Sequence, residues 1–348
     1  MNPYILTTLL LGLGLGTTIT FASSHWLLAW MGLEINTLAI LPLMTQHHHP
    51  RAVEATTKYF LTQATAAATI LFASTTNAWL TGQWNIQQMS HPLPTTMILL
   101  ALALKIGLAP MHSWLPEVLQ GLNLPTGLIL STWQKLAPFI IILQLNLHNT
   151  TLMTILGLTS TLIGGWGGLN QTQLRKILAY SSIAHLGWMA LILQYSPSLT
   201  LLTLALYLIM TSSMFLVFKL NKATNINMLA ISWTKAPLLT SLSPLVLLSL
   251  GGLPPLSGFM PKWLILQELS KQNLPLTATL AALTALLSLY FYLRLSYAMT
   301  LTLSPNNLNG TTPWRLHSLQ LTMPLSIFTI LTISLLPLTP AAITLTAL

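Results

Sequence analysis

Apolar runs of about twenty residues follow one another along almost the whole chain, and each is long enough to cross the ~30 Å apolar core of a bilayer as a helix. Backbone polar groups in lipid must be satisfied internally, so only helices or closed barrels can span it. The runs are near-continuous, whereas barrel strands alternate over about ten residues, so helices are favoured. With 53% hydrophobic and 5% charged residues, the chain is not a soluble domain.

The sequence therefore predicts an all-α polytopic membrane protein with about eleven transmembrane helices. Short connections leave no room for a soluble domain, and the N-terminus shows no removable signal sequence. The expected spans are roughly 3–22, 25–45, 56–80, 94–116, 124–145, 150–169, 174–195, 198–219, 237–272, 275–299 and 323–346.

Two of these spans carry similar interruptions. Gly107, Pro110 and Pro116 break the fourth span, and Gly252, Pro255 and Pro261 break the ninth at the same spacing, 145 residues later. Paired, proline-interrupted apolar segments in two halves of a membrane chain are typical of inverted-repeat transporters. Two unrelated kinked helices are the alternative interpretation.

Small residues recur inside the spans, as in Gly12, Gly14 and Gly16 and in Gly164, Gly165, Gly167 and Gly168. A dinucleotide-binding motif needs a strand, a turn and a helix around its glycines, which is absent here. Close helix packing in lipid explains these glycines better.

Basic residues predict the orientation. When the connections between the expected spans are numbered in chain order, nine basic residues lie at or near even-numbered connections, and one, Lys271, lies at an odd-numbered connection. The positive-inside rule then places the N-terminus on the cytoplasm-like face and the C-terminus opposite. The nine are Arg51, Lys58, Arg175, Lys176, Lys219, Lys222, Lys235, Arg294 and Arg315.

Five titratable residues occupy a central depth in their spans. The midplane lies about ten residues from either end of a span, and Glu34, Lys105, Lys135 and His185 fall there, while Lys262 follows the second break. Ionisable groups inside a membrane are functional by default. A row of such groups on one level predicts a proton path; buried ion pairs that fix helix register, such as Glu34 with Lys105, are the structural alternative.

Unwound backbone at membrane depth is tolerated where it is buried in protein or lines a watery cavity, so both breaks predict local hydration. His112, inside the first break, could relay protons toward Glu117 or hydrogen-bond a freed carbonyl. Glu54 with Lys58 and Glu268 with Lys271 have helical spacing and read as surface pairs. His47, His48 and His49 read as an interfacial polar loop rather than a metal site.

Several classes of protein are excluded by composition. The chain has no Cys, so it holds no disulfide framework and no cysteine-bound iron–sulfur cluster. The formal charge of +9 is scattered over short loops and forms no basic patch for nucleic acid.

The stretch from Gln173 to Trp188, which includes His185, resembles the signature of the antiporter-like membrane subunits of respiratory NADH–quinone oxidoreductase, shared with multisubunit cation/proton antiporters. Leu104 to Glu117 resembles the first broken helix of that family. The whole chain is similar to its vertebrate mitochondrial members.

The resemblance implies specific roles. Glu34 and Lys105 would form the charge pair of the family, Lys135 the connecting lysine, Lys262 the lysine of the second broken helix, and His185 a member of the polar axis. It also implies one integral unit over 1–348. Within it lie a proton-translocating module at 23–285, five-helix inverted repeats at approximately 1–145 and 150–299, and C-terminal helices and a loop at 286–348. Relatives outside animals carry three further N-terminal helices, so other subunits or lipid are expected at the N-terminal edge.

We therefore expect a core membrane-arm subunit that takes part in proton translocation across the mitochondrial inner membrane, multi-pass, with its N-terminus in the matrix and its C-terminus in the intermembrane space. Its partners are expected to be other membrane-arm subunits, including neighbouring antiporter-like chains, and phospholipids. No cofactor is expected on this chain; FMN, iron–sulfur clusters and ubiquinone belong to partner subunits. A stand-alone cation/proton antiporter and a structural subunit that does not pump remain alternatives.

Overall fold

The computed structural model describes residues 2–46, 49–145, 150–234, 236–302, 322–341 and 344. Within those ranges the chain is helical and contains no strand, only the isolated bridges His25↔Asn85 and Gln173↔Asn225. The all-helical prediction is confirmed. Two compact units, Met1–Ile155 and Leu156–Leu348, divide the chain.

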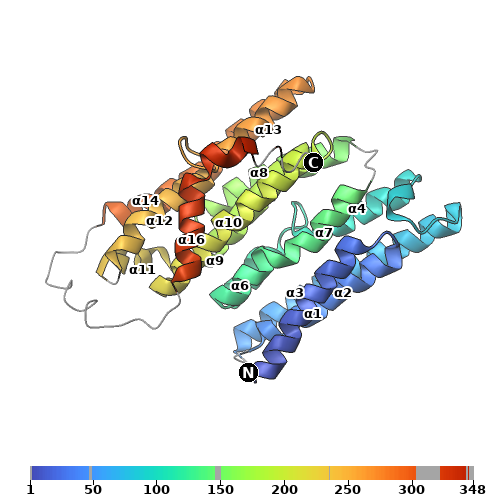
Figure 1. The fold of residues 1–348 in the computed structure, drawn as a ribbon, viewed down its shortest axis with the longest axis horizontal. Helices are drawn as coiled ribbons and strands as arrows, with labels where there is room; N and C mark the ends of the chain where they lie inside the picture. Colours follow the sequence, from blue (N-terminus) through green and yellow to red (C-terminus); the bar gives the residue numbers. More distant parts are fainter. Residues whose placement is uncertain are drawn as a thin grey trace. The chain divides into compact units, whose positions relative to one another are not determined.

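The first unit begins with three long helices that pack side by side (Figure 1): α1 Pro3–Ala22, α2 Trp26–Met44 and α3 Pro50–Thr81. Side chains cap their starts. Asn2 accepts from the Tyr4 N–H in α1, and His49 Nδ1 accepts from the Arg51 N–H in α3. Gly82 ends α3 in the left-handed conformation, with φ of 71°, where glycine is the usual residue.

The rest of the first unit is built from shorter helices. After the 3₁₀ turn η1 (Ile86–Gln88), α4 spans Pro92–Ile106 and α5 spans Trp114–Gly121, with the predicted break between them. The segment predicted as one helix over 124–145 is interrupted at Thr132, giving α6 (Leu124–Ser131) and α7 (Trp133–Gln144). Thr132 Oγ1 donates to the Leu128 carbonyl at 2.7 Å, a local bond of the kind that bends helices. Nothing in the apolar pattern indicated this interruption.

The second unit follows a similar order. It contains α8 (Thr150–Gly168), α9 (Leu174–Ile192), α10 (Pro197–Asn221), the short α11 (Ile226–Ala230) with η2 (Ile231–Thr234), α12 (Pro237–Gly251), α13 (Phe259–Lys271), α14 (Pro275–Thr300), α16 (Met323–Ser334) and η3 (Leu336–Leu338). Trp188, Ile192, Ile265 and Leu269 belong to a buried apolar cluster between α9 and α13. A Cβ on Gly164 would lie 2.6 Å from the Ala184 backbone nitrogen, so the glycines of α8 serve close packing, as predicted.

Both predicted breaks end a helix on a left-handed glycine. Gly107, with φ of 87°, ends α4, and Gly252, with φ of 80°, ends α12. The peptide bonds Ala109–Pro110 and Pro254–Pro255 are cis. Side chains bond to carbonyls that the breaks release. Trp114 Nε1 donates to the Leu104 carbonyl at 3.0 Å, and Lys262 Nζ donates to the Gly251 carbonyl at 2.6 Å. At each break, a side chain of the following helix therefore hydrogen-bonds to a carbonyl at the end of the preceding helix.

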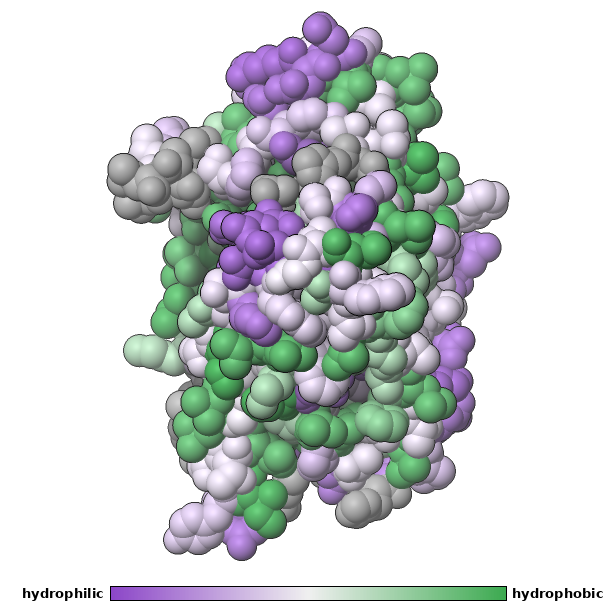
Figure 2. All heavy atoms as spheres, turned by 90° about the vertical axis from the view of Figure 1, so that its right-hand side faces the viewer, coloured by the Kyte–Doolittle hydropathy of each residue, from purple (hydrophilic) through white to green (hydrophobic). Residues whose placement is uncertain are grey.

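Much of the surface is apolar. Five helical stretches in the described chain are long and apolar enough to cross a membrane: α1, α2, Leu124–Gln144, α10 and α14. Only 22% of the apolar window of α1, and of α14, is buried, and Leu11, Leu15 and Leu283 are among the exposed large side chains. Hydrophobic and near-neutral side chains cover much of the face in Figure 2, with hydrophilic ones in separate patches. This surface suits lipid or protein neighbours.

Replacing Gly107 by Ala should destabilise the protein, because a left-handed L-residue costs about 1–2 kcal/mol and the new Cβ would lie 2.9 Å from Leu115 Cδ1. Gly14→Ala is the matched control, since nothing lies within 4 Å of a Cβ there. Thermal stability of the assembled complex would measure both variants. Equal melting temperatures would show that the glycine conformation at the break is dispensable.

Candidate functional site

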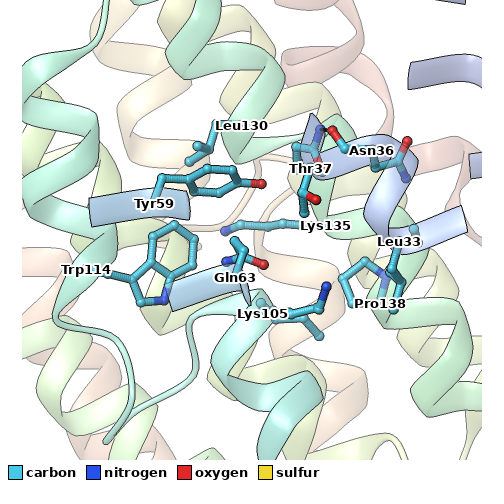
Figure 3. Close-up of a pocket in the computed structure, with 13 residues that line it drawn as sticks. Leu33, Asn36, Thr37, Tyr59, Gln63, Lys105, Trp114, Leu130, Lys135 and Pro138 are labelled. Atoms are coloured by element: carbon cyan, nitrogen blue, oxygen red, sulfur yellow. Dashed lines mark hydrogen bonds between the residues drawn. The ribbon is translucent and has the colours of Figure 1, made fainter. Parts of the chain in front are cut away.

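A small polar cavity lies inside the first unit, where α2, α3, α4, α5, α6 and α7 meet (Figure 3). Its volume is about 20 Å³. A cavity needs roughly 10–15 Å³ of this kind to hold a water molecule, so this one has room for about one. The residues around it are Leu33, Asn36, Thr37, Tyr59, Gln63, Lys105, Ile106, Trp114, Leu130, Gln134, Lys135, Ala137 and Pro138.

Two lysines enter this cavity from different helices. Lys105 lies in the last turn of α4 and is 7% exposed, and Lys135 lies in the first turn of α7 and is 4% exposed. In Figure 3 the ammonium of Lys135 points toward the side of the cavity where Tyr59 and Trp114 lie. Lys105 Nζ has no hydrogen-bond partner in the described part of the chain. Two buried lysines from different helices thus share one small cavity.

Buried amides complete the cavity wall. Both polar atoms of the Asn36 side chain and Nε2 of Gln63 lack a partner among the described residues. Gln134, by contrast, donates from Nε2 to the Asn36 carbonyl at 3.2 Å and ties α7 to α2. Buried polar groups are nearly always hydrogen-bonded to protein or ordered water. Gln63 and Lys105, whose nitrogens lack a partner among the described residues, therefore suit a bound water.

Glu34 lies near this site but not in its wall. Thr37 Oγ1 donates to Glu34 Oε2 at 3.2 Å, and Glu34 interacts electrostatically with both Lys105 and Tyr59. The contact ion pairs in the described ranges are Lys58–Glu54, Lys58–Glu117 and Lys271–Glu268. Glu34 and Lys105 thus attract each other without a direct salt bridge.

His112 and Glu117 have separate partners. His112 Nδ1 lies 3.2 Å from the Pro110 carbonyl, within the break. Glu117 accepts from Lys58 Nζ at 2.8 Å, and Lys58 also contacts Glu54 at 2.8 Å. The hydrogen bond from Lys58 lowers the pKa of the exposed Glu54 carboxyl. The predicted Glu54–Lys58 and Glu268–Lys271 pairs are confirmed, and the third partner, Glu117, was not foreseen.

In the second unit, Lys262 and His185 occupy different surroundings. Lys262 lies beside a cavity of about 430 Å³ with mostly apolar walls that include Trp188, Phe259 and Trp263. His185, half-buried on α9, packs against the ring of Tyr207 with centroids 5.7 Å apart. His185 is not part of that cavity wall.

The predicted residues are thus partly grouped. Lys105 and Lys135 share one cavity with Glu34 nearby, Glu117 joins Lys58 and Glu54, and no described contact joins His185 to Lys262. Asn36, Tyr59, Gln63 and Gln134 were missed. The available signal was their polarity within apolar spans, and Asn36 and Gln134 also lie at the same depth in their spans as the lysines. His47, His48, Lys235 and Arg315 lie outside the described residues, as does the 345–346 end of the last predicted span.

Comparisons with known proteins agree with this arrangement. The family described as "NADH:quinone oxidoreductase/Mrp antiporter, TM" matches residues 23–288, and "NADH dehydrogenase subunit 2 C-terminus" matches 289–343. The chain is 76% identical over 345 residues to NADH-ubiquinone oxidoreductase chain 2 of Tetraodon nigroviridis, covering 99% of both. It is 74% identical to that of Salmo salar, with full coverage of both.

A solved structure is also similar. A chain of respiratory complex I from Thermus thermophilus, in a structure with bound aureothin, matches with a TM-score of 0.85 and 29% identity. The match covers 97% of this chain and 78% of that one.

With helices that end on glycine at two breaks, a lysine near each break and the family match over 23–288, the chain is an antiporter-like membrane subunit. More particularly, the chain belongs to the NADH–ubiquinone oxidoreductase chain 2 family.

Replacing Gln63 by Leu should remove the cavity water, because a similar volume is kept while an amide that would hold the water is lost. A high-resolution map of the assembled complex would show a density peak beside Lys105 in the native protein and none in the variant. The exposed Gln272→Leu is the control. A native map without that peak would refute the hydration of this cavity.

Proposed function

We propose that protons move through this chain by way of Glu34, Lys105, Lys135, His185 and Lys262, with His112 and Glu117 in secondary roles. The observation that carries the proposal is the polar cavity where Lys105 and Lys135 meet. A charged residue costs roughly 2.5–3.5 kcal/mol at the centre of a membrane helix, so two lysines on one small polar cavity are poorly explained by stability. An amine beside one water can release and recapture a proton.

The chain is a proton-translocating membrane-arm subunit of NADH–ubiquinone oxidoreductase and acts as an enzyme only as part of that complex. Other membrane-arm subunits are its partners. In our proposal these include neighbouring antiporter-like chains, with phospholipids around them and no nucleic acid. FMN, iron–sulfur clusters and ubiquinone would be held by partner subunits, in keeping with the absence of Cys from the sequence.

The arrangement in the membrane is part of the same proposal. Eleven spans would cross the mitochondrial inner membrane, with the N-terminus in the matrix and the C-terminus in the intermembrane space. The proton-translocating module would cover 23–285, the inverted five-helix repeats would lie at about 1–145 and 150–299, and C-terminal helices and a loop would occupy 286–348. The two breaks, each ended by a left-handed glycine, and the one bridge in each unit support the repeat.

Lys105→Met and Glu34→Gln should each lower the proton-to-electron ratio of the assembled complex severalfold, because each removes a titratable group from the path. Electron transfer from NADH to an artificial acceptor at the flavin should stay unchanged and would report intact assembly. Lys271→Met, which removes an exposed lysine (side chain 61% accessible), is the control. Native stoichiometry in both test variants would exclude these residues from proton transfer.

A further inference from the structure

The interface between α3 and α5 changes from charged to aromatic to buried polar over a short distance. At one end, a pocket of about 370 Å³ has Arg51, Glu54, Lys58 and Glu117 in its wall. Its ionic groups are solvent-exposed: the side chains of Lys58, Glu54 and Glu117 are 42%, 63% and 53% accessible. Lys58 Nζ contacts a carboxylate oxygen of each acidic residue at 2.8 Å. We call Glu54, Lys58 and Glu117 the ionic triad.

An aromatic pair follows the triad on the same two helices. Tyr59 is next to Lys58 on α3, and Trp114 precedes Glu117 by three residues on α5. Their ring centroids lie 5.7 Å apart, and both side chains are buried. Both rings also belong to the wall of the lysine cavity (Figure 3). The aromatic pair is therefore next to the triad in sequence and also forms part of the cavity wall.

The distance involved is small. From Lys58 to Gln63, which is also part of the cavity wall, five residues of α3 rise about 7.5 Å. Beside the triad the two helices are in close contact: a Cβ on Gly121 would lie 2.7 Å from Ala55 Cβ, and both residues belong to the wall of the triad's pocket. Along α3 and α5 the order is therefore the triad, the aromatic pair and then the cavity.

We propose that the ionic triad is the site where this subunit takes protons from water, and that the Tyr59–Trp114 pair gates their passage to the cavity shared by Lys105 and Lys135. A proton from water would bind the Glu117 carboxylate and break its ion pair with Lys58. It would then leave Glu117 for the cavity water when the rings separate, and the ion pair would form again. This inference rests on the proposed function of the two lysines.

The charged groups around Glu117 support this role. Lys58 faces it directly, and Glu54 competes for the same ammonium from α3, with Arg51 beside Glu54. Lys58 therefore always keeps one carboxylate when the other is protonated. Trp114 is held by its own bond to the Leu104 carbonyl at 3.0 Å, one residue before Lys105. Motion of the ring is thereby linked to the turn of α4 that carries the lysine.

The test compares Glu117→Gln and Lys58→Met in the assembled complex with Glu268→Gln, which removes the acid of another lysine–glutamate pair, Lys271–Glu268, remote in sequence from the cavity. The readout is the rate of NADH-driven proton pumping as a function of pH, with flavin-site electron transfer as the measure of assembly. We expect both triad variants to slow pumping severalfold and to shift its pH profile, and the control to do neither. Triad variants that behave like the control, while Lys105→Met still blocks pumping, would overturn the uptake site and leave the proton path standing. Native pumping in Lys105→Met itself would overturn the path.

A second measurement addresses the gate. Trp114→Ala removes the aromatic side chain, whereas Trp114→Phe keeps a smaller aromatic ring and loses the indole N–H that bonds to the Leu104 carbonyl. Complexes in liposomes with an imposed pH gradient and no NADH should leak protons faster with the Ala variant, and the Phe variant should stay close to the native rate. Equal leak rates for native and Ala proteins would refute the gate.

Discussion

Unpaired polar groups cannot be left in an apolar interior, and this constraint governs the first unit and the second alike. Each broken helix frees carbonyls that its own backbone can no longer bond, and a side chain from the following helix takes one of them. Trp114 does so at the first break and Lys262 at the second. Because unwound backbone at membrane depth survives only with such support, the breaks bring polar and aromatic side chains to the same places as the buried lysines.

At the cavity shared by Lys105 and Lys135, the same constraint favours a bound water, because protein groups do not satisfy every polar atom there. There Nε2 of Gln63 and the ammonium of Lys105 have no partner among the residues that the structure describes, and the space beside them fits about one water. A water molecule in a cavity that is both polar and small can adopt few orientations. That is the property needed for proton transfer between fixed groups, since a proton moves only along short, oriented hydrogen bonds.

The sequence alone predicted what depends on local pattern. Apolar length indicated the helices, and glycine with proline located both breaks, because these residues act on the backbone where they stand. The sequence did not predict contacts between residues that are far apart in the chain. Lys58 and Glu117 are 59 residues apart, and helical spacing revealed only the Glu54 contact within α3. Gln63 was overlooked because one amide in an apolar span has meaning only when Lys105 and Lys135 converge on it. The interruption at Thr132 was missed because a threonine bond to the Leu128 carbonyl leaves no mark on the apolar pattern of the segment.

Lys262 differs from Lys105 in that its ammonium group joins two consecutive helices by hydrogen bonds. Lys262 lies in the first turn of α13, and its Nζ donates hydrogen bonds to two of the last carbonyl oxygens of α12, that of Gly251 at 2.6 Å and that of Leu250 at 3.5 Å. A charge-assisted bond of this kind is roughly twice as strong as a neutral one. Shedding the proton would loosen the joint between the two half-helices, and pulling the half-helices apart would strip the ammonium of its acceptors. In the proposed proton path, the charge of Lys262 and the contact between α12 and α13 would therefore depend on each other.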